Sequence, residues 1–319
     1  MLPVLFAPLQ GYTEDVYRRA HLKLCGGMAE YYTPFMRLEH GEVRRKDRFD
    51  MLPEHNEGVP LVIQVIAGDA AELRILLDAV RSAWHPDEEH RQRVDLNMGC
   101  PFPLQVRHGK GAGLMAHLER LQAIVDEMCE AADFEFSVKM RLGIEGADEW
   151  RSVLPILNDA PLRHLTLHPR VARQQYGGVP LMDVFEDFRA ACLHPLIYNG
   201  DITSVDEIQR LEERYPDLAG VMIGRGLLAR PTLAREYTDG TALTDQDVIA
   251  TLLRLHDALH ESYASRIPGE SQLLAKLRTF WDYAEPALGR KAWKKFHKAG
   301  NMKNYLAARN ECACACMRA

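Results

Sequence analysis

The chain has 319 residues, of which 47% are hydrophobic and 26% are charged. This balance excludes wholesale disorder, and the length suits two domains or one large α/β barrel with an appendage. The mean hydropathy is -0.26, and no apolar run approaches the roughly 18 residues that a membrane span needs. The seven cysteines, an odd number without a recognisable secretion signal, predict a reducing, cytoplasmic compartment.

Charge is unevenly distributed along the chain, whose net charge is -6. Residues 245–319 carry 12 Lys and Arg against 8 Asp and Glu, a net charge of +4, which leaves -10 for residues 1–244. An acidic body with a basic C-terminal segment indicates an anionic partner too large for one pocket. A solvated helical face would give the same counts, so charge alone leaves both interpretations open.

Short apolar runs alternate with helical patterns over the first 240 residues. The expected strand and helix pairs are, in chain order, Leu5–Ala7 with Glu14–Leu24, Ala29–Thr33 with the charged stretch Arg37–Glu57, Leu61–Ile66 with Ala70–Trp84, Val94–Asn97 with Leu118–Ala132, Phe136–Met140 with Asp148–Leu157, His164–Leu167 with Leu181–Ala191, Leu196–Tyr198 with Ser204–Tyr215, and Gly220–Ile223 with Pro231–Tyr237. Asp69 and Ser204 are the expected N-caps of their helices. Eight such units predict an α/β chain folded as a (β/α)8 TIM barrel.

After residue 240 the pattern is helical, over Asp245–Ser262, Glu270–Tyr283 and Pro286–Lys298. These segments predict a small helical bundle, so the expected domains are a barrel over 1–240 and a helical domain over 241–319. Cys312, Cys314 and Cys316 lie beside an end that we expect to be frayed, where three thiols make a poor metal site and their role stays open. His256 and His260 lack the adjacent glutamate of a zinc-binding H-E-x-x-H motif, so no metal site is expected.

The active site of such a barrel lies at the C-terminal ends of the strands. The residues found there in this chain are Ala7, Pro8, Leu9, Gln64, Asn97, Lys139, Arg141, His168, Arg170, Asn199, Gly200, Asp201, Gly224 and Arg225. The loops after the last two strands combine glycines with Arg225, which predicts a phosphate site. A flat heterocycle anchored there would meet Gln64, Lys139 and His168, and the lysine would stabilise an anionic ring such as reduced flavin. Tight turns, a lid salt bridge and a core histidine are the structural alternatives.

Cys100 lies in the turn Gly99–Pro101, directly after the fourth expected strand. Glycine and proline make this turn sharp, so the thiol is expected to project into the mouth of the barrel. The glycine-rich segment Arg107–Leu114 is expected to be mobile enough to carry Cys100 in and out. A thiol with a pKa of about 8.5 can act as an acid at neutral pH, which makes Cys100 a candidate general acid.

The segments Asp95–Pro101 and Gly109–Leu114 together resemble the signature of the tRNA-dihydrouridine synthases. Four further segments are similar to the same family in the same order: Ala7–Leu9, Val138–Gly143, Asn199–Asp201 and Val221–Gly226. The resemblance by motif covers residues 1–240, and the helical tail fits the family's C-terminal tRNA-binding domain.

The resemblance implies an FMN-dependent oxidoreductase that reduces the C5–C6 double bond of particular uridines in tRNA. NADPH reduces FMN, FMN passes hydride to C6, and Cys100 protonates C5. By the same resemblance, Pro8, Gln64, Lys139, His168, Asn199, Gly200, Gly224 and Arg225 contact FMN, with Ala7, Leu9 and Asp201 beside them, and Asn97 and Arg141 lie near the target base. Arg170 and the basic side chains Lys291, Lys294, Lys295 and Lys298 complete the residues expected at tRNA. A monomer suffices, with no obligate protein partner and no membrane.

Two other functions could use the same barrel. Another FMN-dependent oxidoreductase, acting on a small pyrimidine, keeps Lys139 and His168 but gives no reason for the basic helical segment. A barrel that binds phosphate and RNA without redox chemistry predicts a colourless protein. The sequence does not assign the target uridine, and no motif distinguishes NADPH from NADH.

Overall fold

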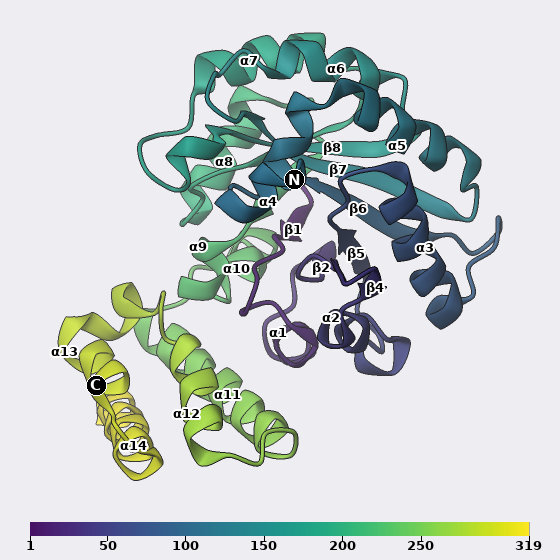
Figure 1. Cartoon of the computed structure of the whole chain (residues 1–319). Coiled ribbons are helices and arrows are strands. Elements are labelled where there is room, and N and C mark those ends of the chain that lie inside the picture. Colours follow the sequence, from purple (N-terminus) through teal and green to yellow (C-terminus); the bar gives the residue numbers. More distant parts are fainter. Residues whose placement is uncertain (319) are drawn as a thin grey trace.

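Eight parallel strands form a closed barrel at the centre of the computed structural model, which describes residues 1–318 (Figure 1). Around the barrel the strands follow the order β1, β10, β9, β8, β7, β6, β5 and β2. Their bounds are β1 Val4–Phe6, β2 Glu30–Tyr32, β5 Leu61–Val65, β6 Gln92–Met98, β7 Phe134–Gly143, β8 Leu162–Val171, β9 Leu196–Asn199 and β10 Gly220–Ile223. The predicted (β/α)8 barrel is therefore confirmed.

Helices cover the outside of the barrel, as Figure 1 shows for α3, α5, α6 and α7. The outer helices are α1 Asp15–Leu24, α3 Ala70–Trp84, α5 Leu118–Glu130, α6 Trp150–Asn158, α7 Met182–Ala191, α8 Val205–Arg214 and α10 Leu233–Asp239. Both predicted N-caps are present, since the Asp69 and Ser204 side chains accept hydrogen bonds from backbone amides in the first turns of α3 and α8. The last unit holds a further short helix, α9 (Arg225–Ala229), that was not predicted.

The stretch after β2 contains a small hairpin where only helix and loop were predicted. Its strands are β3 (Leu38–Glu39) and β4 (Glu42–Val43), and α2 (Arg45–Asp50) follows. His40 and Gly41 connect the strands at φ 54 and φ 82, a left-handed turn that suits glycine. Strands this short carry no readable alternation of apolar and polar residues.

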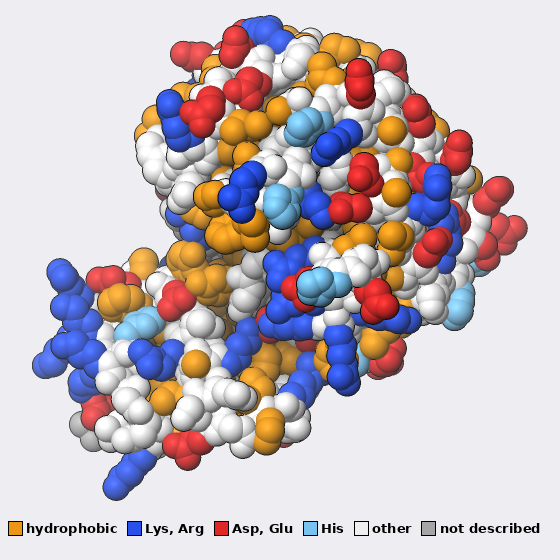
Figure 2. Space-filling view, viewed as in Figure 1, with side chains coloured by type: hydrophobic (Ala, Val, Ile, Leu, Met, Phe, Trp, Pro, Cys, Tyr) orange, Lys and Arg blue, Asp and Glu red, His pale blue; other side chains and the backbone are white. Residues whose placement is uncertain are grey.

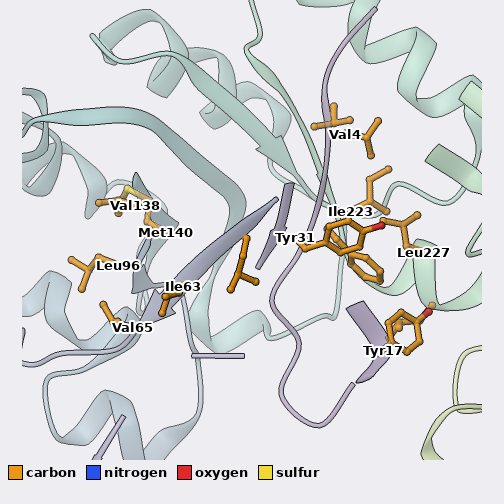
Figure 3. Close-up of a cluster of buried hydrophobic side chains, with 14 of the residues drawn as sticks. Val4, Tyr17, Tyr31, Ile63, Val65, Leu96, Val138, Met140, Ile223 and Leu227 are labelled. Carbon is orange, nitrogen blue, oxygen red and sulfur yellow. The ribbon is translucent and has the colours of Figure 1, made fainter. Parts of the chain in front are cut away.

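Side chains alternate between the two faces of the barrel strands. Outward side chains such as Val4, Ile63 and Val138 pack against the helices in the main hydrophobic core (Figure 3). The opposite positions of β1 and β10 carry Leu5 and Met222, which belong to a separate cluster inside the barrel. The sheet therefore has one apolar core between strands and helices and a second in its interior.

The barrel interior is apolar on one side and polar on the other. The apolar cluster comes from β1, β2, β5, β9 and β10 and contains Leu5, Ala7, Tyr32, Val62, Ile197 and Met222. The alternate positions of β6, β7 and β8 carry Asp95, Asn97, Ser137, Lys139, Arg141, His164, Thr166 and His168. Part of this half of the barrel is an internal polar network, in which Asp95 accepts hydrogen bonds from Gln64 and Ser137.

Four helices follow the barrel: α11 (Asp245–Ala264), α12 (Glu270–Thr279), α13 (Glu285–Lys298) and α14 (Met302–Arg318). Gly240, at φ 64, ends α10 at the predicted division between domains. The helix α14 corrects the expectation of a frayed end, because Cys312, Cys314 and Cys316 lie within it and Cys312 is buried. Within the described residues, no group of three or more His, Cys, Asp or Glu is suited to a metal ion, and no helix is long and apolar enough to cross a membrane.

The helical segment packs beside the mouth of the barrel. The Tyr12 hydroxyl, in the loop after β1, donates to Asp282 at 2.8 Å, and its ring lies 5.5 Å from that of Tyr283. Lys276 of α12 donates to the Gly11 carbonyl at 2.8 Å. These contacts place the connection between α12 and α13 at the C-terminal end of the barrel.

Candidate active site

A cavity of about 850 Å³ opens at the C-terminal ends of the strands. Its wall contains most of the residues that the sequence predicted, namely Ala7, Pro8, Leu9, Asn97, Cys100, Lys139, Arg141, His168, Asn199, Gly200, Asp201, Gly224 and Arg225. The strand order brings these residues together from β1, β6, β7, β8, β9 and β10. Such a cavity is large enough for a flat ring system and a second planar group beside it.

The loops after β9 and β10 meet at Gly226. A Cβ atom at this residue would lie 2.0 Å from the Ile202 carbonyl oxygen, so only glycine allows the two loops to cross. Asn199 ties the same strands together by donating from Nδ2 to the Met222 carbonyl at 2.7 Å. The predicted phosphate site is thus one continuous structure made by both loops.

Asp201 links two arginines at the edge of this structure. It adopts φ 44, a left-handed conformation that aspartate tolerates better than most residues. Arg225 donates from Nη2 to Oδ1 of Asp201 at 3.0 Å, and the Arg225 guanidinium lies 4.3 Å from the centre of the Tyr176 ring. The arginine is therefore held at the cavity wall by a carboxylate and an aromatic face, with further guanidinium hydrogens available for an anion.

His168 is held as a neutral ring. Its Nε2 atom lies 3.0 Å from Nη1 of Arg170, and arginine only donates, so Nε2 is the acceptor and Nδ1 carries the hydrogen. Burial, followed by the positive charges of Arg141 and Lys139, lowers the pKa of His168 well below its usual value. His168 can therefore donate a hydrogen bond from Nδ1 but cannot supply a positive charge at neutral pH.

Lys139 and Arg141 provide positive charge on β7. Burial, with the Arg141 charge next in weight, lowers the pKa of Lys139 to about 8. Burial likewise lowers the pKa of Arg141 to about 10. Arg141 donates from Nε to the Gly99 carbonyl at 2.9 Å and from Nη1 to the Val171 carbonyl at 3.2 Å, which fixes its guanidinium beside the Cys100 turn.

The Cys100 turn is clamped from two sides. Oδ1 of Asn97 accepts hydrogen bonds from the backbone N–H groups of Gly99 and Cys100 at 3.0 and 2.9 Å. On the other side, the Ala112 N–H donates to the Cys100 carbonyl at 3.1 Å, and a Cβ atom at Gly111 would lie 2.8 Å from Cβ of Cys100. Burial raises the pKa of the Cys100 thiol. The thiol is therefore protonated at neutral pH.

The segment after Cys100 differs from the prediction of a mobile loop. Gly111–Ala116 form a short 3-10 helix, and Gly111–Met115 are buried beneath the turn. The glycines therefore serve close packing: at Gly113 a Cβ atom would lie 2.3 Å from the Val106 carbonyl oxygen. The expectation that this segment carries Cys100 in and out is corrected by this buried packing.

Two of the predicted residues at the strand ends lie outside the cavity wall. Gln64 is fully buried, and its amide lies between Asp95 and Asn97. Arg170 is also fully buried, and its guanidinium donates to Asp201, to His168 and to the carbonyls of the loop after β8. Burial corrects the expectation that Arg170 reaches tRNA, because its donors are already used within the protein.

The predicted basic residues of the helical segment lie away from the cavity. Lys291, Lys294, Lys295 and Lys298 are all exposed on α13. Lys295 forms an ion pair with Glu311 of α14. The structure therefore separates a basic outer surface from the cavity.

Several residues of the cavity wall were missed by sequence reasoning. They are Phe35, Tyr176, Asp282, Tyr283, Glu285 and Pro286. The last four come from the helical segment, and no local pattern announces that its helix connection closes the barrel mouth. Tyr176 had a weaker signal, since it is an exposed aromatic in the glycine-containing loop after β8.

Comparisons with known proteins agree with this geometry. The family model described as dihydrouridine synthase matches residues 5–316. The chain is 30% identical to the tRNA-dihydrouridine(16) synthase of Cupriavidus necator over 89% of this chain and 95% of that protein. It is 28% identical to the tRNA-dihydrouridine(16) synthase of Neisseria meningitidis serogroup A over 76% of this chain and 74% of that protein.

Among solved structures, morphinone reductase superposes with a TM-score of 0.52 at 11% identity, over 76% of this chain and 87% of that chain, a likeness of fold. The barrel, the cavity at its C-terminal end and the family match lead to one conclusion. The chain belongs to the dihydrouridine synthase family, the flavin-dependent oxidoreductases that form dihydrouridine in tRNA.

Proposed function

We propose that this chain binds FMN in the barrel cavity and uses NADPH to reduce the C5–C6 double bond of a uridine base in tRNA. One observation carries the proposal: a protonated thiol, a cationic lysine and a neutral histidine line the same cavity. This combination supplies a proton donor, charge stabilisation and a neutral hydrogen-bond donor at one place.

The residues present fit FMN. Gly200, Gly224 and Arg225 would form a cradle for the phosphate, because all three line the cavity, glycine lets the backbone approach an anion closely and Arg225 adds positive charge. Lys139 and His168 would face the ring system, with Pro8 and Leu9 beside it. When bound, FMN supplies the hydride that adds to C6 of uracil. Lys139 contributes positive charge, which favours the anionic reduced ring.

Cys100 is the proposed proton donor. Hydride addition at C6 leaves the electron pair of the double bond at C5, and the S–H bond of Cys100 breaks as its proton forms the new C5–H bond. The thiolate left behind is then reprotonated from water. Burial raises the pKa of this thiol, so it holds its proton at neutral pH until the base is in place.

Asn97 and Arg141 are the proposed contacts for the base. Asn97 uses one Nδ2 hydrogen on Gln64 and its Oδ1 on the turn, which leaves the second Nδ2 hydrogen for a ligand. Arg141 retains its Nη2 hydrogens. A uracil base must leave its stack to reach these groups, because the cavity lies inside the barrel mouth.

Figure 2 shows two basic surfaces, one on the outer edge of the helical segment and one beside the hollow between that segment and the barrel. One is the α13 surface of Lys291, Lys294, Lys295 and Lys298, and the other lies over β4 and α2, where Arg45 and Arg48 are exposed. We propose that tRNA binds across both surfaces by contacts to its phosphates. All of these groups belong to one chain, so a monomer is expected to suffice.

Uridine 16 is the proposed target, because the relatives from Cupriavidus necator and Neisseria meningitidis are named for that position. The proposed function is tested by the visible spectrum of the purified protein, followed by bleaching with NADPH without oxygen. Unmodified tRNA should restore the flavin spectrum, whereas free uridine should not. A colourless protein that takes up no FMN, or recovery with small pyrimidines alone, would contradict the proposal. Mapping dihydrouridine in the product tRNA tests the position.

A further inference from the structure

Asp95 is a buried carboxylate that the proposed chemistry does not use. It is fully buried on β6 between its register partners Gln64 of β5 and Ser137 of β7. Its Oδ2 accepts a hydrogen bond from Nε2 of Gln64 at 2.7 Å, and its Oδ1 accepts one from Oγ of Ser137 at 2.7 Å. Asp95 lies two residues before Asn97 on the same face of β6, so it belongs to the layer of side chains beneath the cavity.

From Asp95 a chain of hydrogen bonds leads to the Cys100 turn. Oε1 of Gln64 accepts from Nδ2 of Asn97 at 2.9 Å. Oδ1 of Asn97 then accepts from the backbone N–H groups of Gly99 and Cys100. The chain therefore connects a buried carboxylate with the backbone of the residue that carries the thiol.

The direction of this chain is set at both of its ends. An ionised carboxylate only accepts, so it requires the NH2 group of Gln64 on its side, and a backbone N–H only donates, so it requires the oxygen of Asn97. Each amide between them then has a single orientation that satisfies every bond. If the acceptor-only end were lost, Gln64 could turn over, and the bond that holds Asn97 in place would be weakened.

We propose that Asp95 is a positioning residue for the proton donor, acting through Gln64 and Asn97 to hold the Cys100 turn in place. The inference rests on the proposed role of Cys100 and extends it below the cavity. The main alternative is that Asp95 acts by charge on Lys139, which lies in the same polar half of the barrel. The two accounts differ in what they change: the first acts on the turn and on protonation of the base, the second on reduction of the flavin.

The test moves the acceptor-only group along the chain. In Asp95→Asn the carboxylate becomes an amide that can donate or accept, so the direction is fixed at the turn alone and Gln64 is free to turn over. In the double variant Gln64→Glu with Asp95→Asn, the amide at residue 95 donates to the new carboxylate, which still accepts from Asn97. Charge and volume are conserved, and the direction at Asn97 is restored.

Amide hydrogen exchange at Gly99 and Cys100 is the direct readout, measured on the purified holoenzyme without tRNA. Asp95→Asn should raise this exchange roughly tenfold, the difference between a charged and a neutral hydrogen bond. It should slow reoxidation by tRNA by a similar factor, while reduction by NADPH stays within about twofold of wild type. The double variant should restore both quantities. Ser137→Ala removes the other donor to Asp95 but leaves the chain of hydrogen bonds intact. The amides of the Cys100 turn in this variant should therefore exchange as in wild type.

Three outcomes would overturn the proposal. The first is unchanged amide exchange at the turn in Asp95→Asn, and the second is failure of the double variant to restore that exchange. The third is slower reduction by NADPH with unchanged exchange at the turn, which would show that Asp95 acts by its charge on Lys139. Should Asp95→Asn fail to fold, Gln64→Met interrupts the same chain of hydrogen bonds in its middle. It should raise amide exchange at the turn in the same way. If Cys100→Ala kept its activity on tRNA, the role of Cys100 would fail, while the exchange result would still decide whether Asp95 holds the turn.

Discussion

The guanidinium of Arg170 meets both carboxylate oxygens of Asp201, with Nη1 donating to Oδ1 at 3.0 Å and Nη2 contacting Oδ2. The same Nη1 donates to His168, and Arg225 shares Oδ1 of Asp201. One buried arginine thus sets the ring orientation of a cavity histidine and the position of the arginine proposed to bind phosphate.

Arg170→Leu is therefore expected to weaken FMN binding by roughly tenfold to 100-fold, because charged hydrogen bonds are lost. The measurement is FMN affinity by fluorescence titration. Arg173→Leu is the matched control, since Arg173 lies three residues further along the chain, just after β8, but is exposed and pairs with Glu145. Equal FMN affinity in the two variants would show that Arg170 does not organise the site.

Cys100→Ala should keep flavin reduction by NADPH but lose tRNA-dependent turnover by about 100-fold or more, the usual contribution of a general acid. Stopped-flow spectroscopy separates the two half-reactions. Cys129→Ala, at an exposed cysteine of α5, should behave as wild type. Full turnover in Cys100→Ala would remove the thiol from the mechanism.

Lys139 should make flavin reduction depend on pH. Burial lowers the pKa of Lys139 to about 8, so its positive charge is present below this value and is lost above it. The rate of reduction by NADPH should therefore fall as the pH rises through 8. In Lys139→Met, NADPH should reduce the flavin about 100-fold more slowly, and the rate should no longer fall as the pH rises. A pH profile of Lys139→Met that matches wild type would assign the titration to another group.

The same lysine should lower stability at neutral pH. Its pKa in the folded protein lies below the ordinary 10.5, so between about 8 and 10.5 the unfolded chain binds more protons. The contribution of Lys139 to the free energy of unfolding therefore rises with pH across this window. Lys139→Met should raise the melting temperature at pH 7, measured by calorimetry at equal flavin content. A lower melting temperature would contradict this assignment.

Charge reversal to glutamate at Lys294, Lys295 and Lys298 should weaken tRNA binding and leave the flavin spectrum unchanged. Log affinity falls as log salt concentration rises, and removing three phosphate contacts should make this negative slope shallower by roughly 2 to 3. Reversal of Lys23, Arg91 and Arg210, exposed elsewhere on the barrel, is the control of equal charge. Equal tRNA affinities of the two triple variants would show that the α13 surface is a solvated helical face that does not bind tRNA.

The regular elements could be predicted because their apolar runs and caps are local signals. Ala70–Trp84 has the bounds that were predicted, together with its Asp69 cap. The hairpin β3–β4 and helix α9 are too short to show a period, and α14 has a sequence without a clear apolar face. Local pattern therefore fixes long elements and misses those that depend on packing.

The sequence predicted which strand ends form the candidate site. It did not predict which of their side chains face the cavity and which are hydrogen-bonded to buried partners. Gln64 and Arg170 lie at the predicted ends, yet each is bonded to a carboxylate from a neighbouring strand or loop, Asp95 and Asp201. Whether a polar side chain faces a ligand or a buried partner depends on residues distant in sequence. The contribution of Asp282 and Tyr283 to the cavity has the same origin.

The hydrogen bond from Tyr12 to Asp282 also bears on how such proteins can be recombined. Tyr12 belongs to the first barrel loop and Asp282 to the helical segment, and both segments contribute to the cavity wall. Lys276 and Glu14 form a second pair across the same seam at 2.8 Å. A chimaera that takes its helices from another family member would inherit half of each pair and a foreign rim over the flavin. Transplanting the helical segment therefore requires the first barrel loop to travel with it.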